Sequence, residues 1–161
     1  MDKIVIEPAT VEDLPQLTDL LIDLFSIERD FRPDPTKHMR GLRLLLEQPS
    51  RGRIFVLRHN AVILGMINLL FTISTAEGGF VIILEDLIIH RDHRHQGFGD
   101  QLVKYAIEYA REKGFVRITL LTDRQNKEAQ RFFKEYGFFE SRMLPMRLLL
   151  SSQNSPDPAQ L

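Results

Sequence analysis

Residues 90–100, HRDHRHQGFGD, combine five basic or imidazole side chains with two glycines. They follow an apolar run and lead into an amphipathic one, which is typical of a strand, a turn and a helix in succession. The free N–H groups and the positive dipole end of such a helix face the turn, and glycines let a phosphate approach the backbone. We therefore expect an anion site carried by Arg94, Gly97, Gly99 and the backbone N–H groups between them.

The spacing in this turn excludes two common phosphate loops. It has neither the glycine-lysine-serine/threonine ending of a Walker loop nor the G-x-G-x-x-G of a dinucleotide fingerprint. A metal site on His90, His93 and His95 is disfavoured because no cysteine or paired acid completes a ligand set. We expect no metal. The structural alternative to the anion site is a plain helix start with charged residues on its surface.

Two adjacent carboxylates, Glu85 and Asp86, interrupt the apolar run over residues 80–89. Burying an unpaired carboxylate costs several kcal/mol or forces its pKa upward, so their presence in a central strand needs a reason. Successive side chains of a strand point to opposite faces, so at most one of the two can face a given cleft. One reason would be a functional role for a carboxylate in a cleft. The alternative for Glu85 is a structural ion pair with a basic side chain. We expect Asp86 to be structural.

The periodicity of apolar residues predicts the elements that hold these groups. Strands are expected over 3–7, over 53–74 as two strands joined at 59–60, and over 80–90, 115–122 and 141–150. Helices are expected over 10–25, over 36–47, from the turn to Gly114, and over 126–138. The order is β-α-α-β-β-β-α-β-α-β, which indicates an α/β (α+β) mixed central sheet with helices on both faces.

Composition limits the classes of function. With 161 residues and 43% apolar side chains, we expect a single domain over residues 1–150 and a flexible polar tail over 151–161. The net charge of −1 argues against sequence-independent nucleic-acid binding, and the absence of cysteine excludes a covalent cysteine intermediate. No run approaches the ~20 apolar residues of a membrane span, and the start lacks a signal peptide's apolar run, so we expect no membrane partner and a cytoplasmic protein.

Two motifs in their predicted contexts resemble the GCN5-related N-acetyltransferase (GNAT) superfamily. Arg94-x-x-Gly97-x-Gly99, between a strand and a helix, is similar to its R/Q-x-x-G-x-G/A pyrophosphate loop. Residues 126–138, NKEAQRFFKEYGF, are similar to its second signature, and "LED" at residues 84–86 resembles diamine and spermidine/spermine-type acetyltransferases. The resemblance covers about residues 80–138 and implies the GNAT acyl-CoA N-acyltransferase fold, with acetyl-CoA as co-substrate.

The resemblance also implies roles for individual residues. Glu85 would take the proton of the acceptor amine, directly or through water, so that the amine can attack the thioester within a ternary complex. Asn126 would contact the pantetheine arm, with a plain helix N-cap as its structural alternative. The side chain of Asp100 should face away from the pyrophosphate while its N–H contributes. The remaining coenzyme contacts implied are Leu87, Ile88, Ile89, Arg94, His95, Gln96, Gly97, Phe98, Gly99 and Asp100.

The chain departs from the family at Phe133, where many members carry a tyrosine thought to reprotonate the coenzyme A thiolate. This departure leaves a catalytically silent acyl-CoA sensor as a rival function. Glu28 and Asp30 in the first interhelical loop, together with "LED", favour a small cationic amine as acceptor over a protein N-terminus or lysine. The apolar run over 141–150 could pair across a homodimer.

Overall fold

The computed structural model describes residues 3–27 and 30–150 of the chain. Within these residues one five-stranded sheet has the order β1-β2-β3-β4-β5, and its neighbours are antiparallel except β4 and β5. The strands are β1 (Ile4–Pro8), β2 (Gly52–His59), β3 (Val62–Ser74), β4 (Gly79–Ile89) and β5 (Ile118–Leu120). The helices are α1 (Leu14–Phe25), α2 (Pro35–Glu47), α3 (Phe98–Glu112) and α4 (Lys127–Lys134), with two 3-10 turns at Val11–Asp13 and Arg91–His93.

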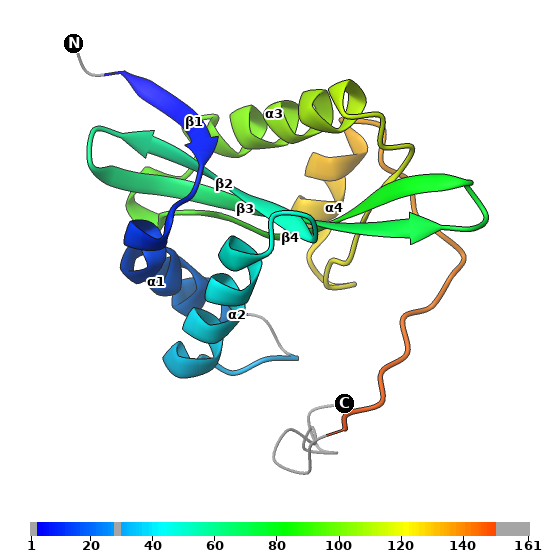
Figure 1. Cartoon of the computed structure of the whole chain (residues 1–161), viewed down its shortest axis with the longest axis horizontal. Coiled ribbons are helices and arrows are strands. Elements are labelled where there is room, and N and C mark those ends of the chain that lie inside the picture. Colours follow the sequence, from blue (N-terminus) through cyan, green and yellow to red (C-terminus); the bar gives the residue numbers. More distant parts are fainter. Residues whose placement is uncertain (1–2, 28–29, 151–161) are drawn as a thin grey trace.

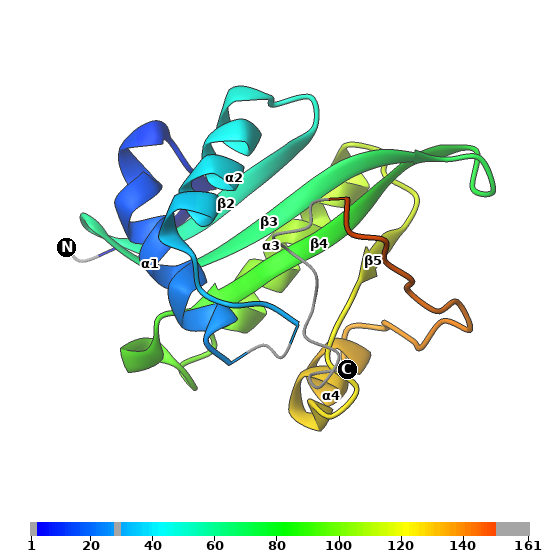
Figure 2. The same ribbon diagram turned by 90° about the horizontal axis from the view of Figure 1, so that it is seen from below.

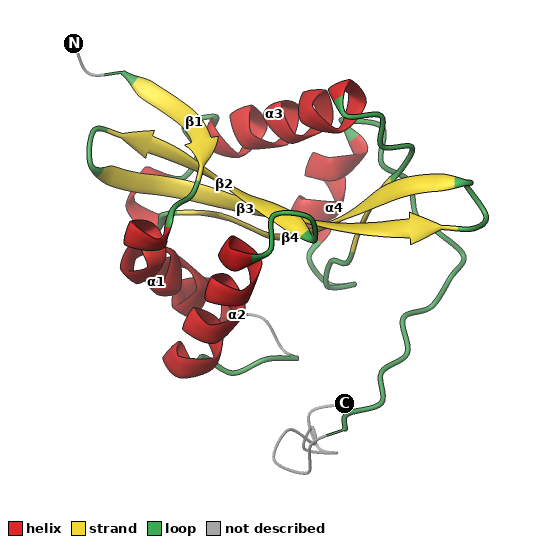
Figure 3. Cartoon of the chain, viewed as in Figure 1, coloured by secondary structure: helices red, strands yellow, loops and turns green. Residues whose placement is uncertain are grey.

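Helices cover both faces of the sheet, which confirms the predicted fold class (Figure 1). α1 and α2 lie against one face and α3 against the other, as the colouring by secondary structure also shows (Figure 3). Each face has its own apolar core. The α3-face core comprises Phe55, Leu57, Leu64, Ile67, Leu69, Ile82, Leu84, Phe98, Leu102, Ala106 and Ala110. The α1/α2-face core comprises Leu14, Leu17, Leu20, Leu21, Leu42, Ile54, Val56, Ile63, Met66 and Ile88.

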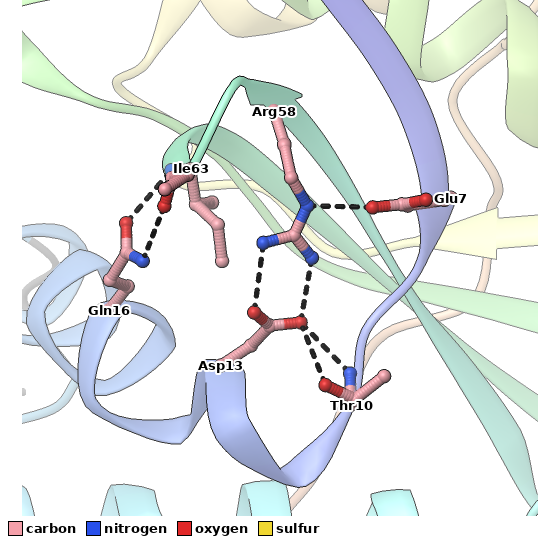
Figure 4. A network of polar contacts seen from close by, with 7 residues as sticks. Glu7, Thr10, Asp13, Gln16, Arg58 and Ile63 are labelled. Atoms are coloured by element: carbon pink, nitrogen blue, oxygen red, sulfur yellow. Dashed lines mark hydrogen bonds and ion pairs between the residues drawn. The ribbon is translucent and has the colours of Figure 1, made fainter.

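An ion-pair network fixes the start of α1 against the sheet (Figure 4). Arg58 of β2 donates from Nη1 and Nη2 to the two carboxylate oxygens of Asp13, at 3.0 and 2.8 Å, and from Nε to Glu7 of β1 at 2.7 Å. Burial acts to raise the pKa of Asp13, but the Arg58 guanidinium and the Thr10 N–H outweigh it and lower that pKa. The predicted helix start at Thr10 with Asp13 is thus confirmed, as a 3-10 turn leading into α1.

β4 is paired on both sides only along its first half. Its ladder with β5 comprises three residue pairs and ends at Leu84 and Leu120, whereas its ladder with β3 continues to Ile89. The β3 register jumps between Asn68↔Glu85 and Met66↔Ile88, so two residues of β4 lie opposite one of β3. One of these two is Asp86, a non-glycine residue with a positive φ of 53°. The bulge and the separation from β5 therefore begin at the same point of the strand.

The C-terminal end differs from the prediction. Residues 141–150 form no strand, and all ten are exposed (Figure 3). A strand needs a hydrogen-bonded partner, Pro145 has no N–H to donate, and no described edge of the sheet pairs with this segment. Figures 1 and 2 place it on the side of the sheet that α1 and α2 cover. β5 is also shorter than the expected 115–122, and the expected tail over 151–161 lies outside the described residues.

No helix in the described part of the chain is long and apolar enough to cross a membrane.

Candidate active site

The predicted anion-binding turn, residues 94–100 and called the anion turn below, lies between β4 and α3. Two of its residues have the positive backbone φ that an open turn requires. His95 and Gly97 both adopt positive φ, at 62° and 81°, and Gly97 is the N-cap residue of α3. Nothing lies within 4 Å of the position that a Cβ would take at Gly97, so the surface of the turn is open there. The first N–H groups of α3 have no partner within the helix and are directed at this turn. The arrangement can hold an anion on backbone N–H groups.

Arg94 is exposed, and its side chain is hydrogen-bonded to the end of β4. Its Nε donates to the carbonyl oxygen of Ile89 at 3.1 Å, so the guanidinium is tethered to the end of β4. The tether uses one of five N–H donors and leaves the others for an anion. The side chain of Phe98 is buried in the α3-face core and fixes the first turn of α3 beneath the anion turn.

Asp100, in the first turn of α3, is bound by a residue that follows α4. Its carboxylate accepts a hydrogen bond from the hydroxyl of Tyr136. Burial, followed by this hydrogen bond, raises the pKa of Tyr136 to about 12. The hydroxyl of Tyr136 is thus already used in a hydrogen bond to Asp100. Phe133 contacts the α3-face core.

Two of the three histidines between β4 and α3 have contacts within this connecting segment. No group of three metal-ligating side chains occurs in the residues that the structure describes. His90 accepts a hydrogen bond at Nδ1 from the N–H of Asp92 at 3.2 Å and caps the 3-10 turn, and its ring contacts that of His93 edge to face. Both residues therefore shape the entry to the anion turn.

Beyond Leu84, β4 no longer pairs with β5, and we call the space along this unpaired edge the gap. The second half of β4 directs backbone groups into it. The backbone N–H of His90 donates a hydrogen bond to the carbonyl oxygen of Leu64 in β3, at 2.7 Å. Because N–H and C=O groups alternate along a strand, Ile88 also faces β3, while Leu87 and Ile89 face the gap. Of the three residues expected to contact pantetheine, these two have backbone groups that face the gap, and the contact itself stays a prediction. The side chain of Ile88 belongs to the α1/α2-face core, whereas those of Leu87 and Ile89 contact the α3-face core.

Glu85 and Asp86 lie at the point where the gap begins. Glu85 is exposed and pairs in register with Asn68 of β3. Asp86 is half-buried, and its Oδ2 accepts a hydrogen bond from Nδ2 of Asn68 at 2.7 Å. Burial, with the negative charge of Glu85, raises the pKa of Asp86 to about 6, although the hydrogen bond from Asn68 acts to lower it. The bulge therefore places both carboxylates beside Asn68.

Asn126 is the N-cap of α4, where its Oδ1 accepts a hydrogen bond from the N–H of Ala129 at 3.0 Å. The structural alternative for this residue is thereby confirmed. The coenzyme contact implied by the resemblance stays a prediction.

The proposed acceptor residues are only partly described. Glu28 lies outside the described residues. Asp30 accepts a hydrogen bond from Nη1 of Arg147 at 2.8 Å, and the same guanidinium lies 5.7 Å from the centre of the Phe31 ring. Asp30 thus links the interhelical loop to the exposed C-terminal segment, a contact between residues 117 positions apart. Its carboxylate is already paired with a cation.

Sequence reasoning missed Asn68, which belongs to this cluster. A buried amide in the run ILGMINLLF was the signal, since an asparagine side chain in a sheet core needs hydrogen-bond partners. Asn68 is 4% exposed, and its only described side-chain partner is Asp86.

Comparisons with known proteins agree with this geometry. The sequence model of the acetyltransferase (GNAT) family matches residues 14–138. The aminoalkylphosphonate N-acetyltransferase of Salmonella typhimurium is 27% identical over 133 residues, which cover 83% of each chain. A crystal structure described as a transcriptional regulator from Bacillus halodurans is 31% identical, with a TM-score of 0.78 over 91% of this chain and 100% of that one.

A third comparison concerns the fold alone. The aminoglycoside N-acetyltransferase AAC(6')-Iy, solved in complex with CoA, is 16% identical and superposes with a TM-score of 0.76 over 94% of this chain and 97% of that one. The family match includes β2 to β5, the anion turn and α4, which are the parts that build the site. The chain therefore belongs to the GNAT acetyltransferase family and is an acetyl-CoA-dependent N-acetyltransferase.

Proposed function

We propose that the protein transfers an acetyl group from acetyl-CoA to the primary amine of a small cationic molecule. The observation that carries this proposal is the second half of β4, where an unpaired backbone edge, two carboxylates and the anion turn follow one another within residues 85–99. No other described segment combines an open strand edge with an anion-binding helix start.

The residues of this segment fit acetyl-CoA, which supplies the acetyl group as a thioester. The backbone groups of Leu87 and the N–H of Ile89 would pair with the amide groups of the pantetheine arm, since the carbonyl oxygen of Ile89 already accepts from Arg94. Arg94 and the N–H groups of the anion turn, residues 94–100, would hold the pyrophosphate. Because the carboxylate of Asp100 is bound by Tyr136, it does not compete for those N–H groups.

The acceptor would approach from the α1/α2 face. Leu84 and Leu87 contact the α3-face core, so Glu85, which lies between them on the strand, faces the opposite side. In a ternary complex the amine nitrogen would bond to the acetyl carbon as the carbon–sulfur bond breaks, and a carboxylate at the bulge would take the ammonium proton. The relatives named for aminoalkylphosphonates and aminoglycosides support a small amine over a protein amine.

A homodimer is the second part of the proposal. The segment over residues 141–150 is exposed along its whole length and carries Met143, Leu144, Met146, Leu148 and Leu150 as exposed apolar side chains. Burying such a run against a second copy would remove it from water. Sedimentation equilibrium of the full chain and of a variant truncated after residue 140 checks this, since the truncated chain should be monomeric.

Release of free coenzyme A thiol over a panel of amines tests the proposed function. We expect turnover with polyamines, aminoalkylphosphonates or amino sugars, and none with lysine-bearing peptides. Acetyl-CoA binding is measured in parallel by calorimetry. Binding without turnover on any amine would support the rival acyl-CoA sensor, which the phenylalanine at residue 133 favours.

A further inference from the structure

The side chain of Asn68, which is buried, and that of Asp86, which is half-buried, form a polar pair beside the gap of β4. Asn68 lies on the fully paired strand β3, and its Nδ2 donates to Oδ2 of Asp86 at 2.7 Å. Its Oδ1 is buried and has no hydrogen-bond partner among the described residues. An unpaired acceptor of this kind costs about 1 to 3 kcal/mol, which is difficult to explain for a purely structural amide. Rotation of the amide would exchange the positions of Oδ1 and Nδ2, which gives the pair a second possible state in which Oδ1 faces Asp86.

Such a state exists if Asp86 gains and loses a proton. An ionised carboxylate only accepts hydrogen bonds, and the Nδ2 group of Asn68 supplies one to it. A protonated carboxyl donates, and rotation of the Asn68 amide by half a turn would place Oδ1 where that proton is offered. Asparagine can thus hold Asp86 in both protonation states, which a lysine or an arginine could not do.

The charges around Asp86 favour such cycling near neutral pH. The charged neighbour that acts on it is Glu85 of its own strand, and β3 contributes only the neutral amide of Asn68. α1, which also contacts β4, contributes buried leucines to the adjoining core. Burial and Glu85 place the pKa of Asp86 about 2 units above that of a free aspartate, closer to what a general base needs.

We propose that Asp86, held by Asn68, is the carboxylate that accepts the proton of the acceptor ammonium, and that Glu85 attracts the cation without taking its proton. This inference rests on the proposed function and replaces Glu85, the residue expected from the sequence, in the proton-transfer step. Asp86 takes one proton from the ammonium before the freed amine attacks the acetyl carbon, and returns it to water after the product leaves. The carbon–sulfur bond then breaks, and the second proton lost by the nitrogen balances the coenzyme A thiolate that leaves. Asn68 acts as a positioning residue.

The test is the pH dependence of kcat/KM for the best amine in three variants and the wild type. Asp86→Asn keeps an acceptor for Asn68 and tolerates the positive φ, so it should fold. We expect its kcat to fall at least about 100-fold and the acidic limb near pH 6 to disappear. Glu85→Gln should raise KM and keep that limb, and Asn68→Leu should move the limb to higher pH because the hydrogen bond that lowers the pKa of Asp86 is lost.

Two controls secure the result. Glu77→Gln, a substitution in the β3–β4 turn, should leave kinetics unchanged, and acetyl-CoA affinity should be equal in all folded chains. A carbon NMR titration of the Asp86 carboxyl in the wild type should show its midpoint near 6. An acidic limb that survives in Asp86→Asn, or that vanishes in Glu85→Gln, would overturn the inference. If the wild type binds acetyl-CoA and acetylates no amine, the proposed function fails and this inference fails with it.

Discussion

The two halves of β4 have similar apolar sequences and different surroundings. Over residues 79–84 the strand pairs with β3 and its end joins β5, and its side chains at residues 81, 82 and 84 are buried. Over residues 85–89 it keeps β3 alone, includes a bulge, and carries both carboxylates. The first half needs only apolar packing, whereas the second half tolerates charge and positive φ because one of its edges is open. The proposed site therefore lies where the sheet is incomplete.

The largest effect on stability is expected in the first half of β4, residues 79–84. We call it the closed half, because its end is paired on both edges. Ile82 is fully buried, so Ile82→Ala should lower the free energy of unfolding by about 2 to 5 kcal/mol. Phe80, which is 60% exposed, is the matched control, and Phe80→Ala should change it by less than about 1 kcal/mol. Urea unfolding followed by circular dichroism measures both. Equal losses at the two positions would show that this half is not the rigid part of the strand.

In the second half of β4, residues 85–89 and called the open half here, removing the negative charge of Asp86 should stabilise the protein. The pKa of Asp86 is raised in the folded state, so the folded state binds more protons than the unfolded one between about pH 4 and 6. The contribution of the Asp86 carboxyl to the free energy of unfolding therefore falls as the pH rises from about 4 to about 6, and it stays low above pH 6. Asp86→Asn should be more stable than the wild type at pH 7.5, by on the order of 2 to 3 kcal/mol, with the advantage shrinking toward pH 4. Urea unfolding across this pH range checks the sign, and a variant less stable at pH 7.5 would contradict it.

The anion turn extends the open half and should show its own asymmetry. Gly97 has a φ of 81°, so Gly97→Ala strains the turn, whereas a Cβ at Gly99 would only reach ordinary contact with Phe132 at 3.7 Å. We expect Gly97→Ala to weaken acetyl-CoA binding about tenfold, which corresponds to ~1.4 kcal/mol, and Gly99→Ala to change it less than threefold. Calorimetric titration separates the two. Equal losses would remove backbone conformation as the cause.

The smallest effect concerns the contact of the C-terminal segment. Arg147 is half-exposed and pairs with Asp30 on the surface, so Arg147→Ala should change the free energy of unfolding by less than about 1 kcal/mol. Arg58→Ala, which breaks a half-buried network with three carboxylate contacts, should cost about 2 to 3 kcal/mol in the same assay. A loss above 2 kcal/mol for Arg147→Ala would mean that the segment is part of the folded core.

The sequence predicted those features that depend on local pattern. The order of elements up to α4, the helix start at residue 10 and the glycine-bearing turn all follow from residue types within a few positions. The strand over 141–150 was wrong because its apolar pattern does not specify a partner edge. The pairs Asn68–Asp86 and Asp30–Arg147 depend on register and chain crossing between distant residues, which no local pattern encodes.

The short ladder between β4 and β5 has a dynamic consequence. Only three residue pairs attach β5 to the sheet, and neither β5 nor α4 contains a fully buried side chain. Regions with few buried contacts open locally without global unfolding, so their amide hydrogens should exchange with solvent earlier than those of β2 and β3. A ligand lying between β4 and β5 would contact both sides of this weak junction and slow that exchange by mass action. Exchange rates over residues 118–134 would thus report occupancy of the gap even in a variant that cannot turn over.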